Sequence, residues 1–362
     1  MMDDTAGGTA AIERLDPAGA ADGDLAAVHA VHVACYRVWG GADLLRTSAE
    51  LAAWVRYPAA FEWRGYWIAR DASGDVAGFA SAGISAHSST PHLHELLVAP
   101  DRRHRGLGRR LLAAVTAECV TRGGRTLHGA FTEPDGERFA RAAGARTGNR
   151  LRLSVLQLPA DLPAPRPVPG CRLQSWVGAT PHDVLDSYAR ARNAINDAPN
   201  ASEAGATQTW TSGRVRDLEA AVARRGHQSR VTVAVDGAGE VVGHTELRVG
   251  PEPGTVARIE DSAVVAAHRG RGLARHIKLE SLRRLAADRP DVRAVITGND
   301  ITNTPMLAVN PPSASSRWVS RPTRSCCLLT LADANAAFSG LPAPLRTRHR
   351  FPHSLRLIHT IV

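Results

Sequence analysis

The chain has 362 residues, of which 44% are hydrophobic and 22% charged, and its formal net charge is +9. This length favours two domains over one, and the composition is typical of a soluble globular protein. No stretch reaches the roughly eighteen uninterrupted apolar residues of a membrane span, and the acidic start MMDDTAGGTAAIERLD is unlike a signal peptide. The five cysteines are odd in number and mostly far apart, which predicts unpaired thiols in a reducing cytoplasm and no metal site.

The first half of the chain predicts helices and strands in a mixed α/β order. The expected elements are helices over 24–38 and 47–57, strands over 66–71, 76–84 and 93–100, and a long helix from residue 106. Asp24 and either Thr47 or Ser48 are expected to cap the first two helices, and Gly123 to end the third.

A proline-rich segment, LPADLPAPRPVPG at 158–170, separates this half from a second one. The same order then returns: helices near 181–195 and 210–226, strands over 230–236, 241–250 and 256–265, a helix over 272–288 and a strand over 292–300. When the two glycine-rich loops are aligned, the halves are offset by 166 residues, which predicts a tandem duplication. The expected division is a domain over 1–160, a linker over 161–170, a second domain over 171–310 and an atypical basic tail over 311–362.

The two glycine-rich loops, DRRHRGLGRR at 101–110 and AHRGRGLARH at 267–276, share one pattern. Both lack the third glycine of a dinucleotide fingerprint and the Gly-Lys-Ser/Thr of a Walker A loop. A solvated arginine cluster is the plain alternative for either loop alone. Because both copies stand between a strand and a helix, we predict instead that their backbone amides bind a pyrophosphate at the helix N-terminus.

This Arg-x-x-Gly-x-Gly/Ala pattern resembles the acetyl-CoA loop of the GNAT N-acetyltransferase superfamily, and the element order resembles that fold. The resemblance extends to the tandem architecture of mycothiol synthase-like actinobacterial acetyltransferases. It implies an α/β (α+β) fold of two GNAT domains, each a mixed, centrally splayed sheet flanked by helices. The second half also carries ITGNDITNTPMLAVN at 296–310, which resembles the family's stretch around the pantetheine.

The resemblance implies acetyl-CoA as cosubstrate, no metal, and a set of cofactor-binding residues in each half. In the first half these are Leu97, Val98, Arg103, Arg105, Gly106, Leu107 and Gly108. In the second half they are Val264, Val265, Arg269, Arg271, Gly272, Leu273, Ala274, Asn303 and Asn310.

In this family a base removes a proton from the attacking amine, and the candidates here are carboxylates on the strand before each loop. Glu95 and Asp261 occupy equivalent positions, eight residues before the loop arginine, and Glu260 is adjacent. Local ion pairs with arginine are the alternative role, and His244 and Glu246 are weaker candidates. The first half ends without the tyrosine that usually serves as general acid, which favours the second half as the catalytic one and the first as degenerate.

The tail over 311–362 departs from the family pattern. It has seven arginines against one acid, Asp333, and therefore carries +6 of the net +9, which weakens a nucleic-acid interpretation of the total charge. Two hypotheses remain open: a reading-frame shift near residue 311, or a genuine basic tail. Without the family's closing strands, we expect the second sheet to keep an unpaired edge and the chain to be weakly stable.

The sequence thus predicts an acetyl-CoA-dependent N-acetyltransferase that acts on a primary amine of a small molecule. The alternative is a non-catalytic, acyl-CoA-binding regulatory protein. We expect a cytoplasmic monomer or homodimer without nucleic-acid or membrane partners.

Overall fold

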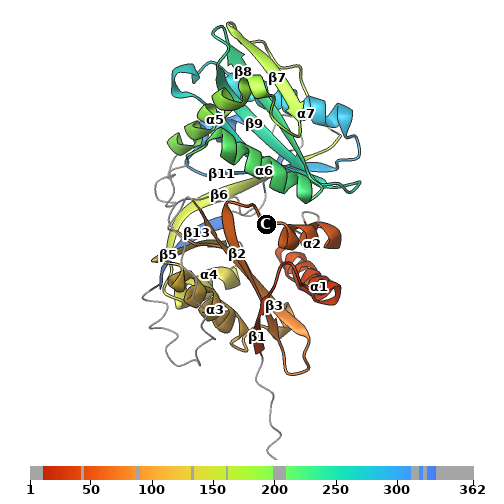
Figure 1. Ribbon diagram of the computed structural model, residues 1–362, viewed down its shortest axis with the longest axis vertical. Helices are drawn as coiled ribbons and strands as arrows, with labels where there is room; N and C mark the ends of the chain where they lie inside the picture. The colour runs from red at the N-terminus through yellow and green to blue at the C-terminus, as the bar shows by residue number, and fades with distance from the viewer. Residues whose placement is uncertain are drawn as a thin grey trace, which may run out of the picture. The chain divides into compact units, whose positions relative to one another are not determined.

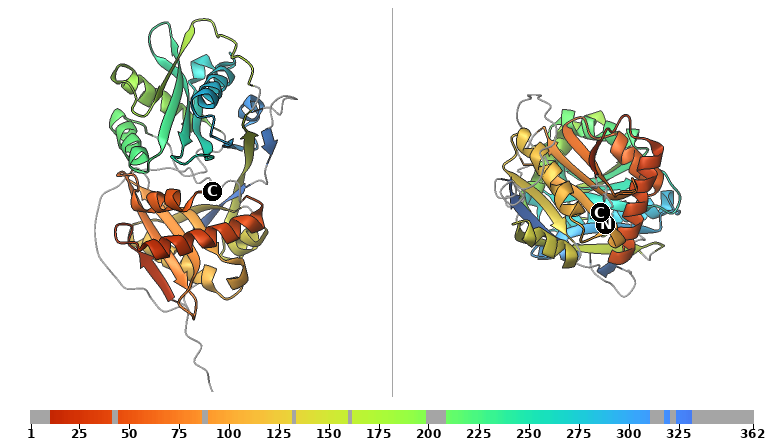
Figure 2. Two further views of the ribbon diagram at one scale, coloured as in Figure 1. Left: turned by 90° about the vertical axis from the view of Figure 1, so that its right-hand side faces the viewer. Right: turned by 90° about the horizontal axis from the view of Figure 1, so that it is seen from below.

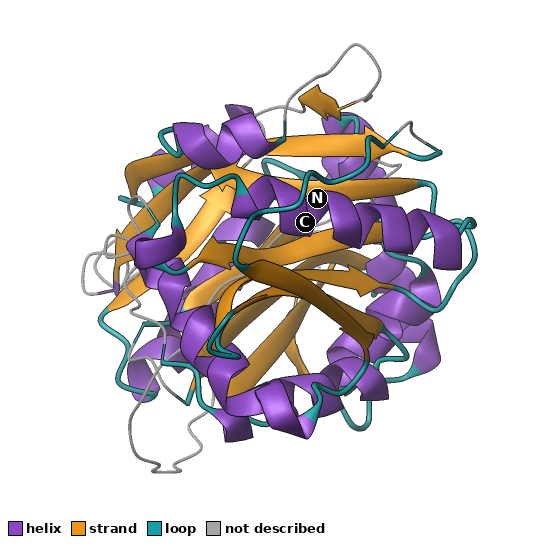
Figure 3. Cartoon of the chain, turned by 90° about the horizontal axis from the view of Figure 1, so that it is seen from above, coloured by secondary structure: helices purple, strands orange, loops and turns teal. Residues whose placement is uncertain are grey.

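The protein is described here from a computed structural model covering residues 11–41, 45–86, 90–131, 134–159, 162–198, 209–310, 318–320 and 324–331. The backbone divides into two compact units. Unit 1 is formed by the chain up to Pro58, by Glu62–Thr147 and by the chain from Cys326, and unit 2 by Ala59–Phe61 and Gly148–Ser325. Both helices and strands contribute to each unit (Figure 3). No described helix combines the length and the hydrophobicity that crossing a membrane requires.

Unit 1 is a sheet covered by helices (Figure 1). Its elements are β1 (Ala11–Leu15), α1 (Asp22–Trp39), α2 (Ser48–Arg56), β2 (Glu62–Arg70), β3 (Val76–Ser85), β4 (His92–Val98), α3 (Leu107–Thr121), β5 (Thr126–Phe131), α4 (Pro134–Ala142) and β13 (Arg324–Thr330). The strand order is β1-β2-β3-β4-β5-β13.

The two cores of unit 1 lie on opposite faces of this sheet. Helices α1 and α2 pack against Tyr66 and Phe79 on one face, and α3 packs against Trp67 and Ala80 on the other. The expected N-cap is confirmed for α2 and wrong for α1, in which Asp24 lies inside the helix. Thr47 and the Glu50 carboxylate cap α2 reciprocally, as expected, whereas the N-cap of α1 is Ala21 without a side-chain bond.

Unit 2 repeats the arrangement. Its elements are the main part of β6 (Arg146–Gln157), then β7 (Cys171–Val177), α5 (Leu185–Arg192), α6 (Ser212–Arg224), β8 (Gln228–Asp236), β9 (Val241–Val249), β10 (Val256–Val264), α7 (Leu273–Asp288), β11 (Ala294–Asp300), α8 (Thr304–Val309) and β12 (Trp318–Ser320). The strand order is β6-β11-β10-β9-β8-β7, and β12 pairs with β6.

Period-2 alternation sends successive side chains of these strands to opposite faces. On β8, Val231, Val233 and Val235 pack with α5 and α6, while Ala234 packs with α7. Figure 2 (left) shows α5 and α6 on one side of the strands of unit 2 and α7 on the other. A polar residue on β8, β9 or β10 therefore belongs to either the α5 face or the α7 face.

Strand β6 comes from the first half of the sequence but completes the sheet of unit 2. It runs antiparallel to β11, from Leu151 opposite Asp300 to Gln157 opposite Ala294. The expectation that the second sheet keeps an unpaired edge is therefore wrong for β11. Leu156 of β6 is also buried in the same core cluster as Val295 of β11. The expected linker over 161–170 lies inside unit 2.

Part of the tail belongs to the fold. Strand β13 lies beside β5 in unit 1, and the buried Leu329 and Leu331 join the core under α3. Most of the tail, including the residues near 311 on which the frame-shift hypothesis rests, lies outside the described residues.

Candidate active site

Each unit has a glycine-rich loop between a strand and a helix, as the sequence predicts. Gly106 and Gly272 are the N-caps of α3 and α7, and both adopt a left-handed backbone, with φ of 80° and 81°. A Cβ at either position would meet nothing within 4 Å, so glycine is needed for the backbone conformation and not for space. The tight turn leaves the first amides of each helix without an intrahelical partner, where an anion can bind them.

The loop arginines hold these loops against the strands. Arg103 Nε donates to the Val98 carbonyl at 3.2 Å, and Arg269 Nε donates to the Val264 carbonyl at 2.9 Å. Arg105 and Arg271 also donate to backbone carbonyls, those of Asp101 and Pro169. The predicted contacts of these arginines with a phosphate remain predictions, and the structure assigns the four side chains a role in shaping the loops.

The parallel strands beside each loop separate. β10 pairs with β11 at three positions, Val256–Arg258 with Ala294–Ile296, and among the described residues the pairing ends there. Among the described residues, β4 and β5 pair only at His92 and His128. Parted strands can admit an extended chain such as pantetheine between them. The Val265 amide does not face this gap, because it donates to the Val242 carbonyl at 2.9 Å.

A register shift marks the strand before each loop. β10 has one extra residue relative to β9 between Ile259 and Ser262, the segment that contains Glu260 and Asp261. β4 has a matching irregularity relative to β3 just before Glu95. Such bulges redirect side chains and recur beside active sites. Both predicted carboxylates therefore stand where the sheet is locally reshaped.

In unit 2 this carboxylate belongs to a buried ionic cluster. Arg192, the last residue of α5, donates from Nη2 to Asp261 Oδ2 at 2.7 Å, and the same nitrogen lies 3.2 Å from Glu246 Oε2. All three side chains are at most 5% exposed. The guanidinium carbon of Arg192 also stacks 3.4 Å from the centre of the Trp210 ring. Asp261 is thus brought together with a cation that the sequence prediction missed.

The charges of this cluster can be assigned from its neighbours. Burial by itself would raise the pKa of Glu246, but Arg248 and Arg192 lower that pKa overall, so Glu246 stays ionised. Burial and the nearby Arg192 lower the pKa of His244 to about 4, so this imidazole is neutral near pH 7. Neither ring nitrogen of His244 has a hydrogen-bond partner among the described residues. Glu260 lies farther from a cation, with its Oε1 3.7 Å from Arg248 Nη1.

The equivalent carboxylate in unit 1 is bonded to two basic side chains. Glu95 Oε2 lies 2.9 Å from His32 Nε2, and Glu95 Oε1 lies 3.3 Å from Arg46 Nη1. His32 Nδ1 lies 2.8 Å from the Val28 carbonyl oxygen, so the ring is held between this carbonyl and Glu95. Burial would raise the pKa of Glu95, but His32 and Arg46 bring it down to about 2.

Comparison with known proteins agrees with this geometry. Two segments of the chain, residues 25–144 and 194–309, match the family described as "Acetyltransferase (GNAT) family". The chain belongs to the GNAT acetyltransferase family. The two matches also show that it carries two GNAT domains in tandem.

Solved structures share this fold. A tandem GNAT protein from the clavulanic acid biosynthesis pathway aligns with a TM-score of 0.73 and 23% identity, over 89% of this chain and 98% of that one. A GCN5-related N-acetyltransferase from Sphaerobacter thermophilus aligns at 0.63 and 17%, over 89% and 96%. A glucosamine N-acetyltransferase region of a fungal multi-domain β-N-acetylglucosaminidase aligns at 0.59 and 14%, over 90% and 39%. No curated protein matches the chain. The finer resemblance to mycothiol synthase-like GNAT proteins stays a prediction.

The asparagines predicted beside the GNAT cofactor have structural partners. Asn303 caps α8, where its Oδ1 accepts from the Met306 amide at 3.2 Å. Asn310 follows α8. Its side-chain Nδ2 donates to Asn299 Oδ1 at 2.9 Å, and its Oδ1 accepts from Lys278 Nζ at 2.9 Å. The sequence prediction missed Lys278, although a lone lysine in the apolar helix pattern of 272–288 was a usable signal.

The tyrosine argument for choosing between the two GNAT domains does not hold. Tyr188 is the last tyrosine of the chain, so the second half lacks a late tyrosine as the first half does. Tyr188 is fully buried on α5, its ring packs edge-on against His244 with centroids 5.6 Å apart, and burial raises the pKa of its hydroxyl. The two units must be distinguished by other residues.

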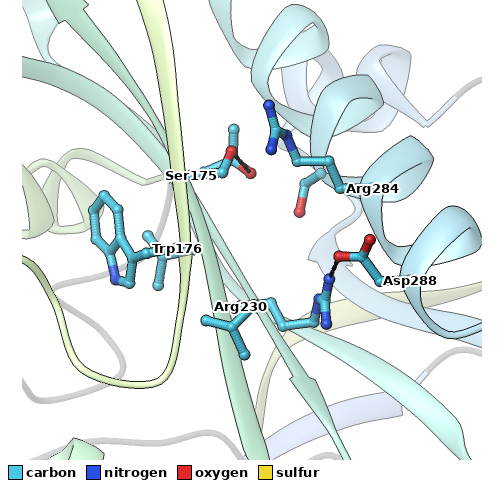
Figure 4. Close-up of a pocket in the computed structure, with 9 residues that line it drawn as sticks. Ser175, Trp176, Arg230, Arg284 and Asp288 are labelled. Atoms are coloured by element: carbon cyan, nitrogen blue, oxygen red, sulfur yellow. Dashed lines mark hydrogen bonds and ion pairs between the residues drawn. The ribbon is translucent and has the colours of Figure 1, made fainter.

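A small groove of unit 2 lies away from the loop. It is lined by β7, β8 and the C-terminal part of α7, including Ser175, Arg230 and Arg284, and the Arg230–Asp288 ion pair lies along it (Figure 4). Its cavity of about 60 Å³ is far below the several hundred Å³ of typical small-molecule pockets. Gly272 is at the other end of α7, so this groove is separate from the candidate site.

Proposed function

We propose that the protein transfers an acetyl group from acetyl-CoA to the primary amine of a small molecule, with unit 2 as the catalytic domain. The observation that carries this proposal is the combination, in unit 2, of the Gly272 loop, the parted strands β10 and β11 and the buried carboxylate cluster. The loop amides suit the pyrophosphate of the cosubstrate because they form a helix N-terminus without bulky side chains. A cytoplasmic location and a monomer or homodimer without nucleic-acid partners are parts of the same proposal.

The chemistry requires a neutral amine and a proton acceptor beside the thioester carbon. Asp261 is the predicted acceptor with the best position, since the bulge of β10 carries it and Arg192 holds it. His244 is a weaker candidate, because burial and Arg192 lower its pKa to about 4. Glu260 and Glu95 remain predictions, and Glu95 is already bonded to His32 and Arg46.

The alternative function, acyl-CoA binding without catalysis, fits unit 1 better than it fits the whole chain. Its loop repeats the anion-binding geometry of unit 2, whereas its carboxylate is already bonded to His32 and Arg46. We therefore propose that unit 1 binds an acyl-CoA without catalysis or serves as a scaffold. One solved relative is titled a glucosamine N-acetyltransferase, and amino sugars are accordingly among the amines to be tried.

The test is release of coenzyme A thiol from acetyl-CoA with a panel of amines that includes amino sugars, polyamines and aminoglycosides. We expect at least one amine to support turnover and Asp261→Asn to lower kcat roughly 100-fold, in the range of lost acid–base catalysis. Asp186→Asn, on the outer surface of α5, is the matched control and should keep wild-type kcat. Acetyl-CoA binding without turnover on any amine would favour the regulatory alternative.

A further inference from the structure

Lys278 is the only lysine of the chain, and it is buried in unit 2. It lies on α7 with 3% of its surface exposed, and its Nζ donates to Asn310 Oδ1 at 2.9 Å and lies 3.9 Å from Met306 Sδ. Among the described residues no carboxylate comes within ion-pair distance of this nitrogen. A buried amine with only neutral partners is costly as a cation, so a functional reason for it should be sought.

The surroundings of Lys278 contain little charge. Helix α8 has no titratable residue, and Glu280 on α7 bonds to Arg284 at 2.7 Å. Among the strand residues that face α7, only Arg230 is charged, and it is paired with Asp288. The others are Gly243, Leu247, Ala257, Ile259, Ala234 and Val264. Burial alone lowers the pKa of Lys278 to about 7. The charged and neutral forms are therefore close in free energy near neutral pH, as a group that exchanges a proton requires.

The position of Lys278 connects the two elements that flank the candidate cofactor site. It lies six residues after Gly272, about 9 Å along α7 at 1.5 Å per residue. Its partners, Asn310 and Met306, belong to α8 and its C-terminal cap, directly after β11. Lys278 therefore bridges the helix that follows β10 and the helix that follows β11, the two strands that separate.

Lys278 and the carboxylate cluster lie on opposite faces of the sheet. Gly243 of β9 faces Ile277 of α7, whereas the next residue, His244, packs against Tyr188 of α5. Asp261 bonds to Arg192 on that same α5 face. A proton acceptor on one face and a proton donor on the other can then act on two sides of a thioester held between the parted strands.

Unit 1 lacks this amine. Leu112, six residues after Gly106, occupies the position equivalent to Lys278 on α3 and is buried among apolar side chains. Gly144 stands 166 residues before Asn310. The Lys278–Asn310 pair thus distinguishes the two units where the missing tyrosine does not.

We propose that Lys278, oriented by Asn310, is the general acid of unit 2 that protonates the departing coenzyme A sulfur. This inference rests on the proposed function. The amine nitrogen forms the new bond to the acetyl carbon, the carbon–sulfur bond breaks with its electron pair on sulfur, and one hydrogen moves from Nζ to that sulfur. This step leaves Lys278 as a neutral amine. The proton lost by the acceptor amine reaches Lys278 through solvent, so the overall products are the amide and the free thiol.

The first test uses the lysine as its own probe. In the full chain labelled with ¹³C-lysine, the side-chain Cε should give one signal that titrates with a midpoint near pH 7 and shifts when coenzyme A or acetyl-CoA saturates the protein. Asn310→Asp places a carboxylate beside Nζ, so the midpoint should rise. Calorimetric binding of coenzyme A with no change in the lysine signal would overturn the proposal and leave the proposed function intact.

The second test separates proton transfer from charge alone. Lys278→Met should lower kcat about 100-fold with the KM for acetyl-CoA within about threefold, and Lys278→Arg should not restore kcat because a guanidinium keeps its proton. In Asn310→Asp, the alkaline limb of the pH–rate profile should move to higher pH, together with the midpoint of the NMR titration. Lys278→Met turning over within threefold of wild type, or full rescue by arginine, would contradict a proton-transfer role. A wild type that releases no thiol with any amine would instead overturn the proposed function.

Discussion

At the scale of single residues, Arg192 is the centre of unit 2. It neutralises two buried carboxylates, Asp261 and Glu246, and stacks on Trp210. Removing one partner of a buried ionic group leaves uncompensated charge, which costs more than the pair contributes. The same guanidinium helps to keep Glu246 ionised, so the stability of the buried cluster depends on this one side chain.

Arg192→Met should therefore lower the free energy of unfolding by about 3–5 kcal/mol, measured by urea denaturation. The matched control is Arg190→Met on the same helix, whose exposed pair with Glu240 contributes little. Equal effects of the two substitutions would show that the Arg192 cluster is not the stabilising centre described here.

His244 gives a pH dependence of known sign. Its pKa is about 4 in the folded protein against an ordinary 6.5, so between those values the unfolded chain binds a proton that the folded one does not. Stability should therefore fall as the pH drops from 6.5 to 4, with a contribution of up to about 1.4 kcal/mol per pH unit.

His244→Leu should remove this contribution, so that the free energies of unfolding of wild type and variant change differently between pH 7 and pH 4.5. The exposed His182→Leu is the control and should follow the wild type. Parallel curves for His244→Leu and the wild type would mean that His244 is protonated in the folded protein.

At the scale of elements, β6 is the strand whose partner could not be predicted from the sequence. The amphipathic helices and the glycine loops could be predicted because hydrophobic periodicity and Gly106 or Gly272 act locally. The pairing of β6 with β11 joins residues about 140 apart in sequence, and nothing in either strand's own pattern specifies that partner. The same limit explains why His32 and Arg192 were missed as partners of Glu95 and Asp261.

The structure predicts that the second domain cannot stand without β6. Residues 162–325 expressed alone should lack a cooperative thermal transition, whereas residues 146–325 should unfold cooperatively, because β6 pairs with β11 along seven positions. In the full chain, Leu156→Ala should cost about 2–5 kcal/mol, because this fully buried side chain packs against Leu282 and Val295. Cooperative unfolding of residues 162–325 would contradict this role of β6.

At the scale of the whole molecule, the chain carries two GNAT units with the same glycine-rich loop and different side chains around it. Unit 1 has Glu95 bonded to His32 and Arg46, with Leu112 in its helix, whereas unit 2 has Asp261 bonded to Arg192, with Lys278 at the equivalent position of its helix. The duplication could be predicted from the 166-residue offset of the two loops. The partners of each carboxylate could not, because they depend on which distant side chains meet it in the fold.

The central claim, that unit 2 binds acetyl-CoA for catalysis, is tested by one paired measurement: acetyl-CoA calorimetry and thiol release on Gly272→Glu and Gly106→Glu. Glutamate at a left-handed N-cap strains the loop and places a negative charge where the pyrophosphate should bind. We predict that Gly272→Glu weakens binding at unit 2 about 100-fold and abolishes thiol release, while Gly106→Glu keeps thiol release. Folded Gly272→Glu protein with wild-type turnover would contradict the account.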